Sequence, residues 1–328
     1  MPQDLKEKLN QFRNKKILIV GDVMVDAYVW GKVTRISPEA PVPIVSVTKK
    51  EARLGGAANV ALNIKSLGAS PLLASIVGND EQGLNFLRLL KDSDISQDGI
   101  LQTDRPTTVK TRVLSGSQHT LRIDEELTTP IDKNLEEKLI NRVKQLFASN
   151  TIDGIIFQDY DKGVLTENGI TKITEIAQSY SVPIFVDPKK NNFNHYKQVT
   201  VFKPNFKEFT EGLKLEIEKH DISALHQAAK KFMQTMNIQY MLVTLSELGI
   251  FVCDAESYYH IPTTFKQIAD VSGAGDTVIS VVSLCICSGI SITDTAHIAN
   301  TAGGIVCSYA GVVPIKFDDL VGVALVAT

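Results

Sequence analysis

A glycine-rich turn that ends in an aspartate is the feature of this sequence best suited to chemistry. The segment reads Asp270-Val-Ser-Gly-Ala-Gly-Asp-Thr277, and an apolar run of small residues to Ser288 follows, which indicates a buried helix. Small residues let a ligand approach the backbone, and a helix start offers unpaired N–H groups that suit a phosphate. Asp276 would repel that phosphate, a conflict that is resolved if its carboxylate accepts a proton from an attacking hydroxyl. The structural alternative is a cap that complements the helix dipole.

A second glycine cluster, Gly55-Gly-Ala-Ala-Asn59, precedes a helical stretch to Leu67. One interpretation is a tight turn with close helix packing. The other is a place where the backbone approaches a polyhydroxylated ligand, with Asn59 supplying both a donor and an acceptor.

Polar residues also follow five predicted strands directly. They are Asp22 with Asp26, Gln158-Asp159, Asp187-Pro-Lys189, Lys203-Pro-Asn205 with Glu208, and Ser246-Glu247. Each alone could be a helix cap or a turn residue. Because ligands of open α/β sheets bind beyond the carboxyl ends of the strands, we expect these side chains to gather at one edge of a sheet.

The elements that position these residues alternate along the chain. Short apolar runs predict buried strands at Ile17–Val20, Leu72–Val77, Ile155–Phe157, Ile184–Val186, Val199–Phe202 and Met241–Leu245. Segments with helical spacing lie between them at Asn134–Phe147, Thr171–Tyr180 and Ser223–Met236. This order predicts an α/β fold with a doubly wound, mostly parallel sheet.

Two segments depart from that alternation and predict a small β-lid. Residues 42–47 are extended and bounded by prolines, and the segments 107–114 and 120–124 alternate on either side of a Ser-Gly-Ser turn. We interpret them as antiparallel strands with one solvated face, in a lid built from about residues 22–48 and 105–125. The alternative is a decorated edge of the main sheet.

Composition excludes several classes of protein. The chain has 328 residues, 44% hydrophobic and 22% charged, with 34 basic and 37 acidic side chains and a net charge of −3. This balance gives no basic field for nucleic acid or an anionic membrane, and the polar N-terminus does not resemble a signal peptide. The four cysteines form no C-x-x-C pair and predict buried thiols in a reducing cytoplasm: Cys253, Cys285, Cys287 and Cys307. The P-loop, dinucleotide, zinc-protease and protein-kinase motifs are absent.

The two glycine segments carry a family resemblance that extends over nearly the whole chain. In order and separation, Gly55–Asn59 and Asp270–Asp276 resemble the two signatures of the ribokinase-like (PfkB) carbohydrate kinases. A closer resemblance, to the branch that acts on D-glycero-D-manno-heptose 7-phosphate, is carried by five further segments. These are Gly21–Asp26, Arg35–Pro43, Lys110–Arg112, Leu121–Asp124 and Val186–Lys189. The resemblance implies one ribokinase-like kinase domain over residues 1–328.

Roles for individual residues follow from this resemblance. It implies Asp276 as the catalytic base and the backbone of Gly273, Ala274 and Gly275 as an anion hole. On the nucleotide side it implies Asn205 and Glu208 for Mg²⁺ and the ATP phosphates, Ser246 and Gly249 along the nucleotide, and Asn300 and Gly304 near the adenine. Glu208 would act on the Mg²⁺ through water. On the sugar side it implies Asp22, Gly55, Gly56 and Asn59, with Asp159 near the substrate or the metal.

The distal phosphate of such a substrate needs cations. Lys110, Arg112 and Arg122 alternate onto one face of the predicted lid, and Lys189 lies in another substrate segment. Arginine suits bidentate phosphate recognition, so some of these side chains are predicted to bind the phosphate. A solvated, charged lid face is the alternative.

The implied reaction is transfer of a phosphoryl group from ATP to the anomeric hydroxyl of heptose 7-phosphate, a step of ADP-heptose and lipopolysaccharide core biosynthesis. It implies ATP and Mg²⁺, with a monovalent cation as an optional addition, and a cytoplasmic homodimer formed through the lid. The sequence ends at Thr328, so we expect any adenylyltransferase step to belong to another chain. Two alternatives stay open: a family kinase acting on a fructose phosphate, ribose or a nucleoside, and an inactive sugar- or nucleotide-binding regulator.

Overall fold

A nine-stranded sheet forms the centre of the protein. Its strands are β1 (Lys16–Gly21), β4 (Ser70–Gly78), β5 (Ile100–Thr103), β8 (Gly154–Gln158), β9 (Ile184–Asp187), β10 (Val201–Phe202), β11 (Tyr240–Thr244), β12 (Ile250–Cys253) and β13 (Tyr258–Ile261). Their order is β13-β12-β11-β10-β9-β8-β1-β4-β5, parallel except for β12 and β13. The computed structural model describes residues 3–116, 118–263, 270–309 and 311–324, so Ser117 of the predicted turn lies outside the described residues. The predicted sheet type is confirmed.

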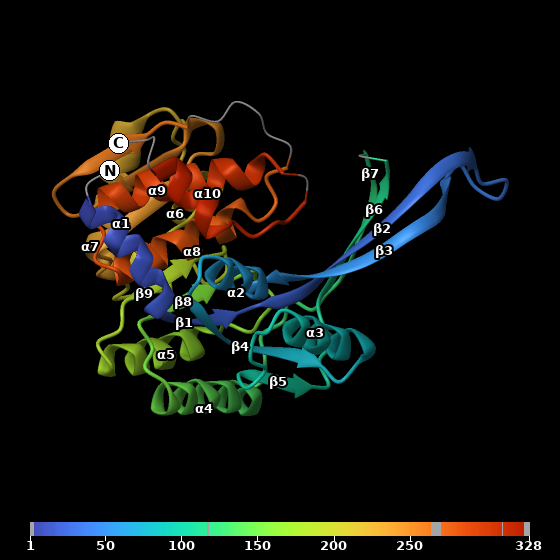
Figure 1. Cartoon of the computed structure of the whole chain (residues 1–328), viewed down its shortest axis with the longest axis horizontal. Coiled ribbons are helices and arrows are strands. Elements are labelled where there is room, and N and C mark those ends of the chain that lie inside the picture. The colour runs from blue at the N-terminus through green and yellow to red at the C-terminus, as the bar shows by residue number, and fades with distance from the viewer. Residues whose placement is uncertain (1–2, 117, 264–269, 310, 325–328) are drawn as a thin grey trace.

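Helices cover both faces of this sheet (Figure 1). On one face, α2 (Ala57–Ser66), α8 (Ala274–Cys287) and α9 (Ile292–Cys307) share an apolar core with α1 (Gln3–Asn10), α3 (Glu81–Asp92) and α10 (Phe317–Ala324). On the other face, α4 (Lys133–Ser149), α5 (Glu167–Ser179), α6 (Phe206–Leu213) and α7 (Ile222–Met236) enclose a second core. Neighbouring residues of β1 enter opposite cores, Ile19 the first and Val20 the second. This two-sided burial explains why the parallel strands are continuous apolar runs.

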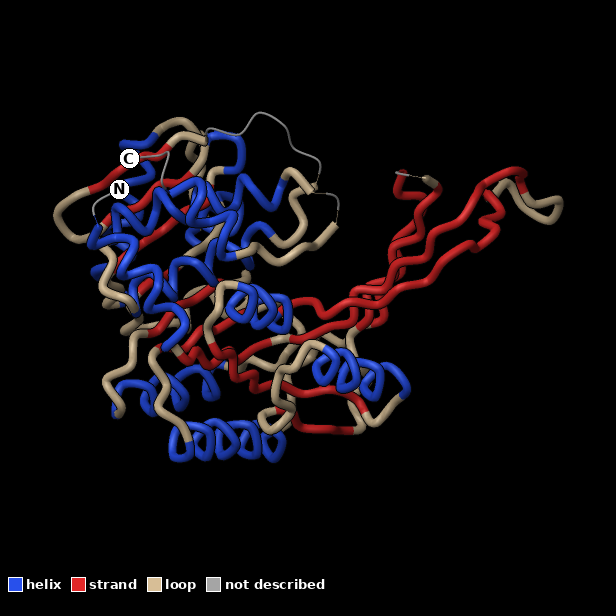
Figure 2. The backbone as a smooth tube through the Cα atoms, in the orientation of Figure 1, coloured by secondary structure: helices blue, strands red, loops and turns tan. Residues whose placement is uncertain are grey.

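A separate four-stranded sheet projects from the body as the lid (Figure 2). It consists of β2 (Val23–Ile36), β3 (Pro43–Gly56), β6 (Val109–Ser115) and β7 (Gln118–Glu125), in the order β3-β2-β6-β7. The predicted antiparallel pairing of the segments 107–114 and 120–124 is present between β6 and β7. β3 stays paired with β2 as far as Gly56, beyond the expected limit at residue 48, and the pairing of β2 with β6, which was not predicted, is parallel. The lid is therefore a mixed sheet.

The two faces of the lid differ in polarity. The register pairs Arg112 with Arg122 on β7 and with Tyr28 on β2, so these side chains share one face. Val113 pairs with Leu121 on the opposite face, where Leu121 is 56% exposed. The expected gathering of cations on one face is therefore confirmed.

None of the helices in the described ranges combines the length and apolar character that crossing a bilayer requires. All four cysteines are free, but burial follows the prediction only for Cys253 and Cys285. Cys287 and Cys307 are partly exposed, because each lies at the end of its helix.

Candidate active site

A cavity of about 790 Å³ opens at the carboxyl ends of the central strands. It is bounded by the residues that end or follow β9, β10 and β11 and by the first turn of α8. Eleven of the residues given an individual role from the sequence line it: Lys189, Asn205, Glu208, Ser246, Gly249, Gly273, Ala274, Gly275, Asp276, Asn300 and Gly304. Of the polar residues expected to gather at one edge, those that follow β9, β10 and β11 line this cavity, whereas Asp22, Asp26, Gln158 and Asp159 do not.

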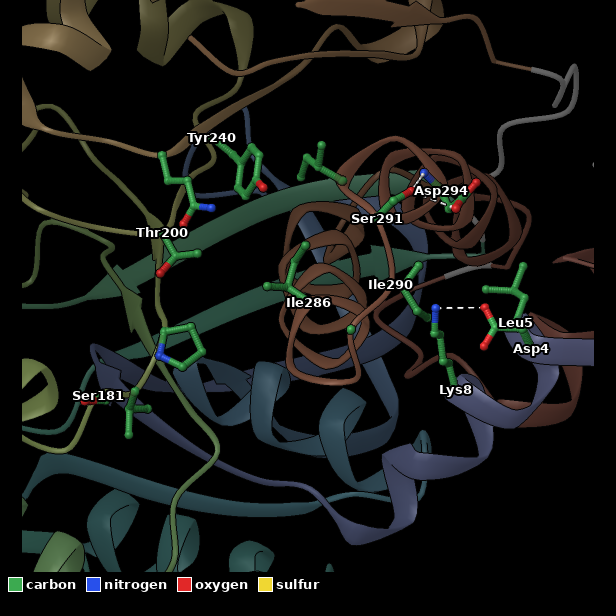
Figure 3. A pocket seen from close by; sticks show the side chains of 15 residues that line it. Asp4, Leu5, Lys8, Ser181, Thr200, Tyr240, Ile286, Ile290, Ser291 and Asp294 are labelled. Carbon is green, nitrogen blue, oxygen red and sulfur yellow. Dashed lines mark hydrogen bonds and ion pairs between the residues drawn. The ribbon is translucent and has the colours of Figure 1, made fainter. Parts of the chain in front are cut away.

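A second cavity, of about 780 Å³, lies at the opposite ends of the same strands (Figure 3). Pro183, Thr200 and Tyr240, which line it, lie at the beginnings of β9, β10 and β11. Two of its charged side chains, Lys8 and Asp4, pair with each other at 2.8 Å. Ligands of open α/β sheets bind at the carboxyl ends, so the first cavity is the candidate active site.

Asp276 lies in the first turn of α8 and is only 4% exposed. Its Oδ1 accepts hydrogen bonds from the Tyr160 hydroxyl at 2.7 Å and from Gln158 Nε2 at 3.2 Å. Its Oδ2 accepts one from Asn59 Nδ2 at 2.6 Å. A cap that only complemented the dipole would not need three donors from two other elements, so the geometry favours a functional carboxylate.

Burial raises the pKa of Asp276 to about 6. The charge of Asp187 raises this pKa as well, whereas hydrogen bonds from Tyr160 and Asn59 and the charge of Lys203 lower it. A carboxylate with such a pKa is ionised at neutral pH and basic enough to accept a proton from a hydroxyl during reaction.

The start of α8 supplies backbone donors beside this carboxylate. Gly273 is the N-cap residue and adopts a φ of +81°, which favours glycine. The N–H of Ala274 donates to the carbonyl of Val271 at 3.3 Å. The next two amides, of Gly275 and Asp276, belong to the first turn, which has no acceptors within its own helix. The predicted anion hole would therefore draw mainly on the amides of Gly275 and Asp276, and it stays a prediction.

A buried cation lies beside this turn. Lys203 is 2% exposed, and its Nζ is 3.0 Å from Asp187 Oδ2. A Cβ atom added at Gly275 would lie 3.6 Å from that Nζ. Gln158 connects the pair to the base, because its Nε2 lies 3.2 Å from both Asp187 Oδ2 and Asp276 Oδ1. Lys203 thus places a positive charge where the helix start would receive a phosphate.

Asn205 and Glu208 form a reciprocal cap at the start of α6. The Asn205 side chain accepts from the Glu208 N–H at 2.8 Å, and Glu208 Oε2 accepts from the Asn205 N–H at 2.9 Å. Lys189 donates to the other oxygen of Glu208. Burial lowers the pKa of Lys189, but the charges of Asp187 and Glu208 outweigh it and raise the pKa overall. Lys189 therefore lines the cavity as the partner of Glu208, and its expected contact with the substrate stays a prediction.

The donor set fits Mg²⁺ held mainly by phosphates and water. In the described parts of the chain, no three His, Cys, Asp or Glu side chains form a cluster able to hold a metal. Mg²⁺ commonly retains water and uses one or two carboxylates together with substrate phosphates. Glu208, whose two oxygens already have partners, fits contact through water.

The sugar-side aspartates Asp22 and Asp159 hold the loop after β8. Asp22 is fully buried and accepts the backbone N–H groups of Tyr160, Lys162 and Val164 at 2.8–3.1 Å. Asp159 accepts the hydroxyl of Tyr196 at 2.7 Å, together with two further donors. The expected contact of either carboxylate with sugar stays a prediction.

The second glycine cluster connects the lid to the base. A Cβ atom added at Gly55 would lie 2.3 Å from Asp26 Oδ2, so the glycine makes room for that carboxylate. Gly56 is the N-cap residue of α2, and Asn59 in the first turn of that helix donates to Asp276 Oδ2. Asn59 is 2% exposed, and its Oδ1 has no hydrogen-bond partner within the described ranges.

Each predicted lid cation already has a carboxylate partner. Arg112 pairs with Asp26, and its guanidinium lies 5.4 Å from the centre of the Tyr28 ring. Lys110 is 3.2 Å from Asp124, which also contacts Arg122 at 2.8 Å. A phosphate bound here would therefore compete with, or join, existing ion pairs.

Several side chains of the site were missed as individual contributors from the sequence. Gln158, Asp187 and Lys203 belonged to the polar positions after strands, but their spacing gave no role for any one of them. Tyr160 had no sequence signal beyond its place two residues after β8.

The fold and this cavity define an ATP-dependent carbohydrate kinase. Residues 14–316 match the pfkB family of carbohydrate kinases, and the chain belongs to that family. Two solved structures share the fold. Phosphofructokinase-2 from Escherichia coli in complex with fructose-6-phosphate has a TM-score of 0.77 and 17% identity, over 95% of this chain and 99% of that one. Arabidopsis thaliana ribokinase complexed with ribose and ATP has a TM-score of 0.72 and 16% identity, over 94% and 98%.

Relatives with higher sequence identity are bifunctional HldE proteins. The protein from Helicobacter pylori strain HPAG1 is 39% identical over 93% of this chain. Those from Sulfurimonas denitrificans and Trichlorobacter lovleyi are 36% and 38% identical over 93% and 90% of it. The chain spans 60–65% of the length of these three relatives.

Proposed function

We propose that the protein phosphorylates the anomeric hydroxyl of D-glycero-D-manno-heptose 7-phosphate with ATP, giving the 1,7-bisphosphate for ADP-heptose biosynthesis in the cytoplasm. The observation that carries the kinase chemistry is the buried Asp276 at the start of α8, in the cavity at the carboxyl ends of the strands. The heptose substrate is supported by the segments quoted from the sequence and by the identity to bifunctional HldE proteins.

In this mechanism Asp276 accepts the proton of the anomeric hydroxyl, whose oxygen attacks the γ-phosphorus of ATP in line. The bond between that phosphorus and the ADP oxygen breaks. The amides of Gly275 and Asp276 and the ammonium of Lys203 face the charge on the transferring group, which is the main contribution that proteins make to phosphoryl transfer. Glu208 and Asn205 would hold Mg²⁺ through water, and bound Mg²⁺ supplies further neutralisation of phosphate charge.

For the distal phosphate we propose the charged face of the lid. Lys110, Arg112, Arg122 and the nearby Lys162 pair with Asp26, Asp124 and Glu126. The network brings four cations close together, and Arg112 lies closest to the glycine cluster through Asp26. A phosphate dianion would therefore be attracted to this network.

We also propose that two copies pair through their lids. The face opposite the cations carries exposed apolar side chains, with Leu121 56% and Ile123 45% exposed. The outer strands β3 and β7 are edges of the lid sheet. Exposed edges and apolar surface of this kind are commonly covered by a partner.

The deciding experiment is a coupled ADP-release assay across heptose 7-phosphate, fructose 6-phosphate, fructose 1-phosphate and ribose. We expect the highest kcat/KM with heptose 7-phosphate, and Asp276→Asn should lose about 10²–10⁴-fold in kcat while still binding ATP. Asp294, an exposed acid in the first turn of α9, provides the matched control Asp294→Asn, which should keep wild-type turnover. A higher kcat/KM with another sugar would contradict the proposed heptose substrate. An active Asp276→Asn variant would contradict the proposed role of Asp276 as the base.

A further inference from the structure

The two oxygens of Asp276 are occupied unequally. Oδ1 accepts two hydrogen bonds, from the hydroxyl of Tyr160 at 2.7 Å and from Gln158 Nε2 at 3.2 Å. Oδ2 accepts one, from Asn59 Nδ2 at 2.6 Å. Each carboxylate oxygen has about two lone-pair sites, so Oδ1 is saturated and Oδ2 retains one.

The hydroxyl of Tyr160 is held in place by the loop that follows β8. The N–H of Tyr160 donates to Asp22 Oδ2 at 2.8 Å, and the N–H groups of Lys162 and Val164 donate to the same carboxylate at 3.1 Å. The Lys189 ammonium lies 5.4 Å from the centre of the Tyr160 ring, on the wall of the cavity. The backbone of Tyr160 is therefore fixed by Asp22 and its ring is contacted by Lys189, while its hydroxyl is directed at Asp276.

A second observation, the environment of Asn59, also points to Oδ2 of Asp276. Oδ1 of Asn59 is a buried acceptor without a hydrogen-bond partner in the described part of the chain, although the Nδ2 of the same amide binds Asp276 Oδ2. An unpaired buried acceptor is costly, and a donor from a ligand would satisfy it. A sugar with neighbouring hydroxyls could donate one to Asp276 Oδ2 and the next to Asn59 Oδ1.

We propose that Tyr160 is a positioning residue, anchored through Asp22, that holds Oδ1 of Asp276 so that Oδ2 is the oxygen that takes the proton of the sugar hydroxyl. The inference rests on the proposed function, in which Asp276 is the base. The proton moves from the hydroxyl to Oδ2, the sugar oxygen bonds to the γ-phosphorus, and the bond to ADP breaks. Tyr160 keeps its own proton throughout.

The pH dependence of turnover reports on this arrangement. The charged groups that face Asp276 are Asp187 and Lys203 from the ends of neighbouring strands and Lys189 beside Tyr160, while Asp26 of the lid acts on Tyr160. Asp22, which holds the backbone of Tyr160, has a pKa that burial and the charge of Asp159 raise to about 7. None of these changes when the hydroxyl of Tyr160 is removed. Because that hydroxyl stabilises the charged carboxylate, its loss should raise the pKa of the base.

The test is Tyr160→Phe, with single-turnover rates measured from pH 5 to 9. We expect the acid limb of the pH–rate profile to move up by about one pH unit, because one charge-assisted hydrogen bond to the carboxylate is lost, and the rate at pH 7 to fall about twofold as the ionised fraction of Asp276 falls. The Kd of ATP should stay within twofold, which also shows that the variant is folded. Gln158→Met, which removes the longer bond to Oδ1, should move the limb in the same direction by less.

Tyr196→Phe is the matched control, because Tyr196 is also buried and donates its hydroxyl to a carboxylate, Asp159, at 2.7 Å. The acid limb of the pH–rate profile of Tyr196→Phe should coincide with that of the wild type. An unshifted limb in both Tyr160→Phe and Gln158→Met, with Asp276→Asn inactive, would overturn this inference and leave the proposed function standing. An active Asp276→Asn variant would overturn both.

Discussion

Replacement of Lys203 by Met, with Asp187 left in place, should destabilise the protein measurably. The two side chains are 2% and 7% exposed, and Lys203 Nζ lies 3.0 Å from Asp187 Oδ2. Removal of one partner of a buried ion pair leaves an uncompensated charge and costs about 3–5 kcal/mol. A chain of 328 residues has an unfolding entropy of about 0.7 kcal/mol/K, so the midpoint of thermal unfolding should fall by about 4–7 °C.

The assay is calorimetric unfolding of Lys203→Met and of the double variant Lys203→Met/Asp187→Asn, combined with the KM for ATP. The double variant should recover most of the stability, because neither charge remains, but its KM for ATP should stay raised without the cation beside Gly275. Lys172→Met is the control, since Lys172 and Glu175 form a pair that is 51% and 56% exposed, worth about 0–1 kcal/mol. A single variant that unfolds within 1 °C of wild type, on the order of 0.7 kcal/mol, would refute the reasoning.

Four further outcomes are expected. Asp276 must be ionised to accept a proton and its pKa is raised to about 6, so kcat should fall about tenfold from pH 7 to pH 5; a flat profile would contradict this. Asp22→Asn should lower kcat and leave the KM for sugar unchanged if Asp22 positions the loop, whereas a raised KM alone would indicate a direct sugar contact. Arg112→Gln should raise the KM for the sugar phosphate by about tenfold or more, and the same change at the exposed Arg122 by less; equal effects would place the phosphate elsewhere. Leu121→Lys should shift the proposed dimer to a monomer in analytical ultracentrifugation. A dimer that is unchanged by this substitution would exclude the apolar lid face as the dimer interface.

The sequence by itself determined the sheet, the lid and many of the residues that line the cavity. Buried parallel strands are apolar on both faces, so they are visible as continuous runs such as Ile17–Val20. The residues that follow such strands must meet at one edge, and for this reason Asn205, Glu208 and Ser246 were found without knowledge of the contacts. The glycine turn before Asp276 is likewise a local pattern that predicts a helix start.

Only the tertiary structure decided which side chains reach one another across the sheet. Asp276 receives its donors from Asn59 and Tyr160, which are 217 and 116 positions away along the chain. No periodicity links positions so far apart, because the direction of each side chain depends on how three separate elements pack. The same reason explains why Lys203 is paired with Asp187 and why Asp22 turns toward a loop. Short segments of the sequence predict helix starts, strands and the residues that follow them. The pairing of charged side chains inside the protein depends on how the whole chain folds.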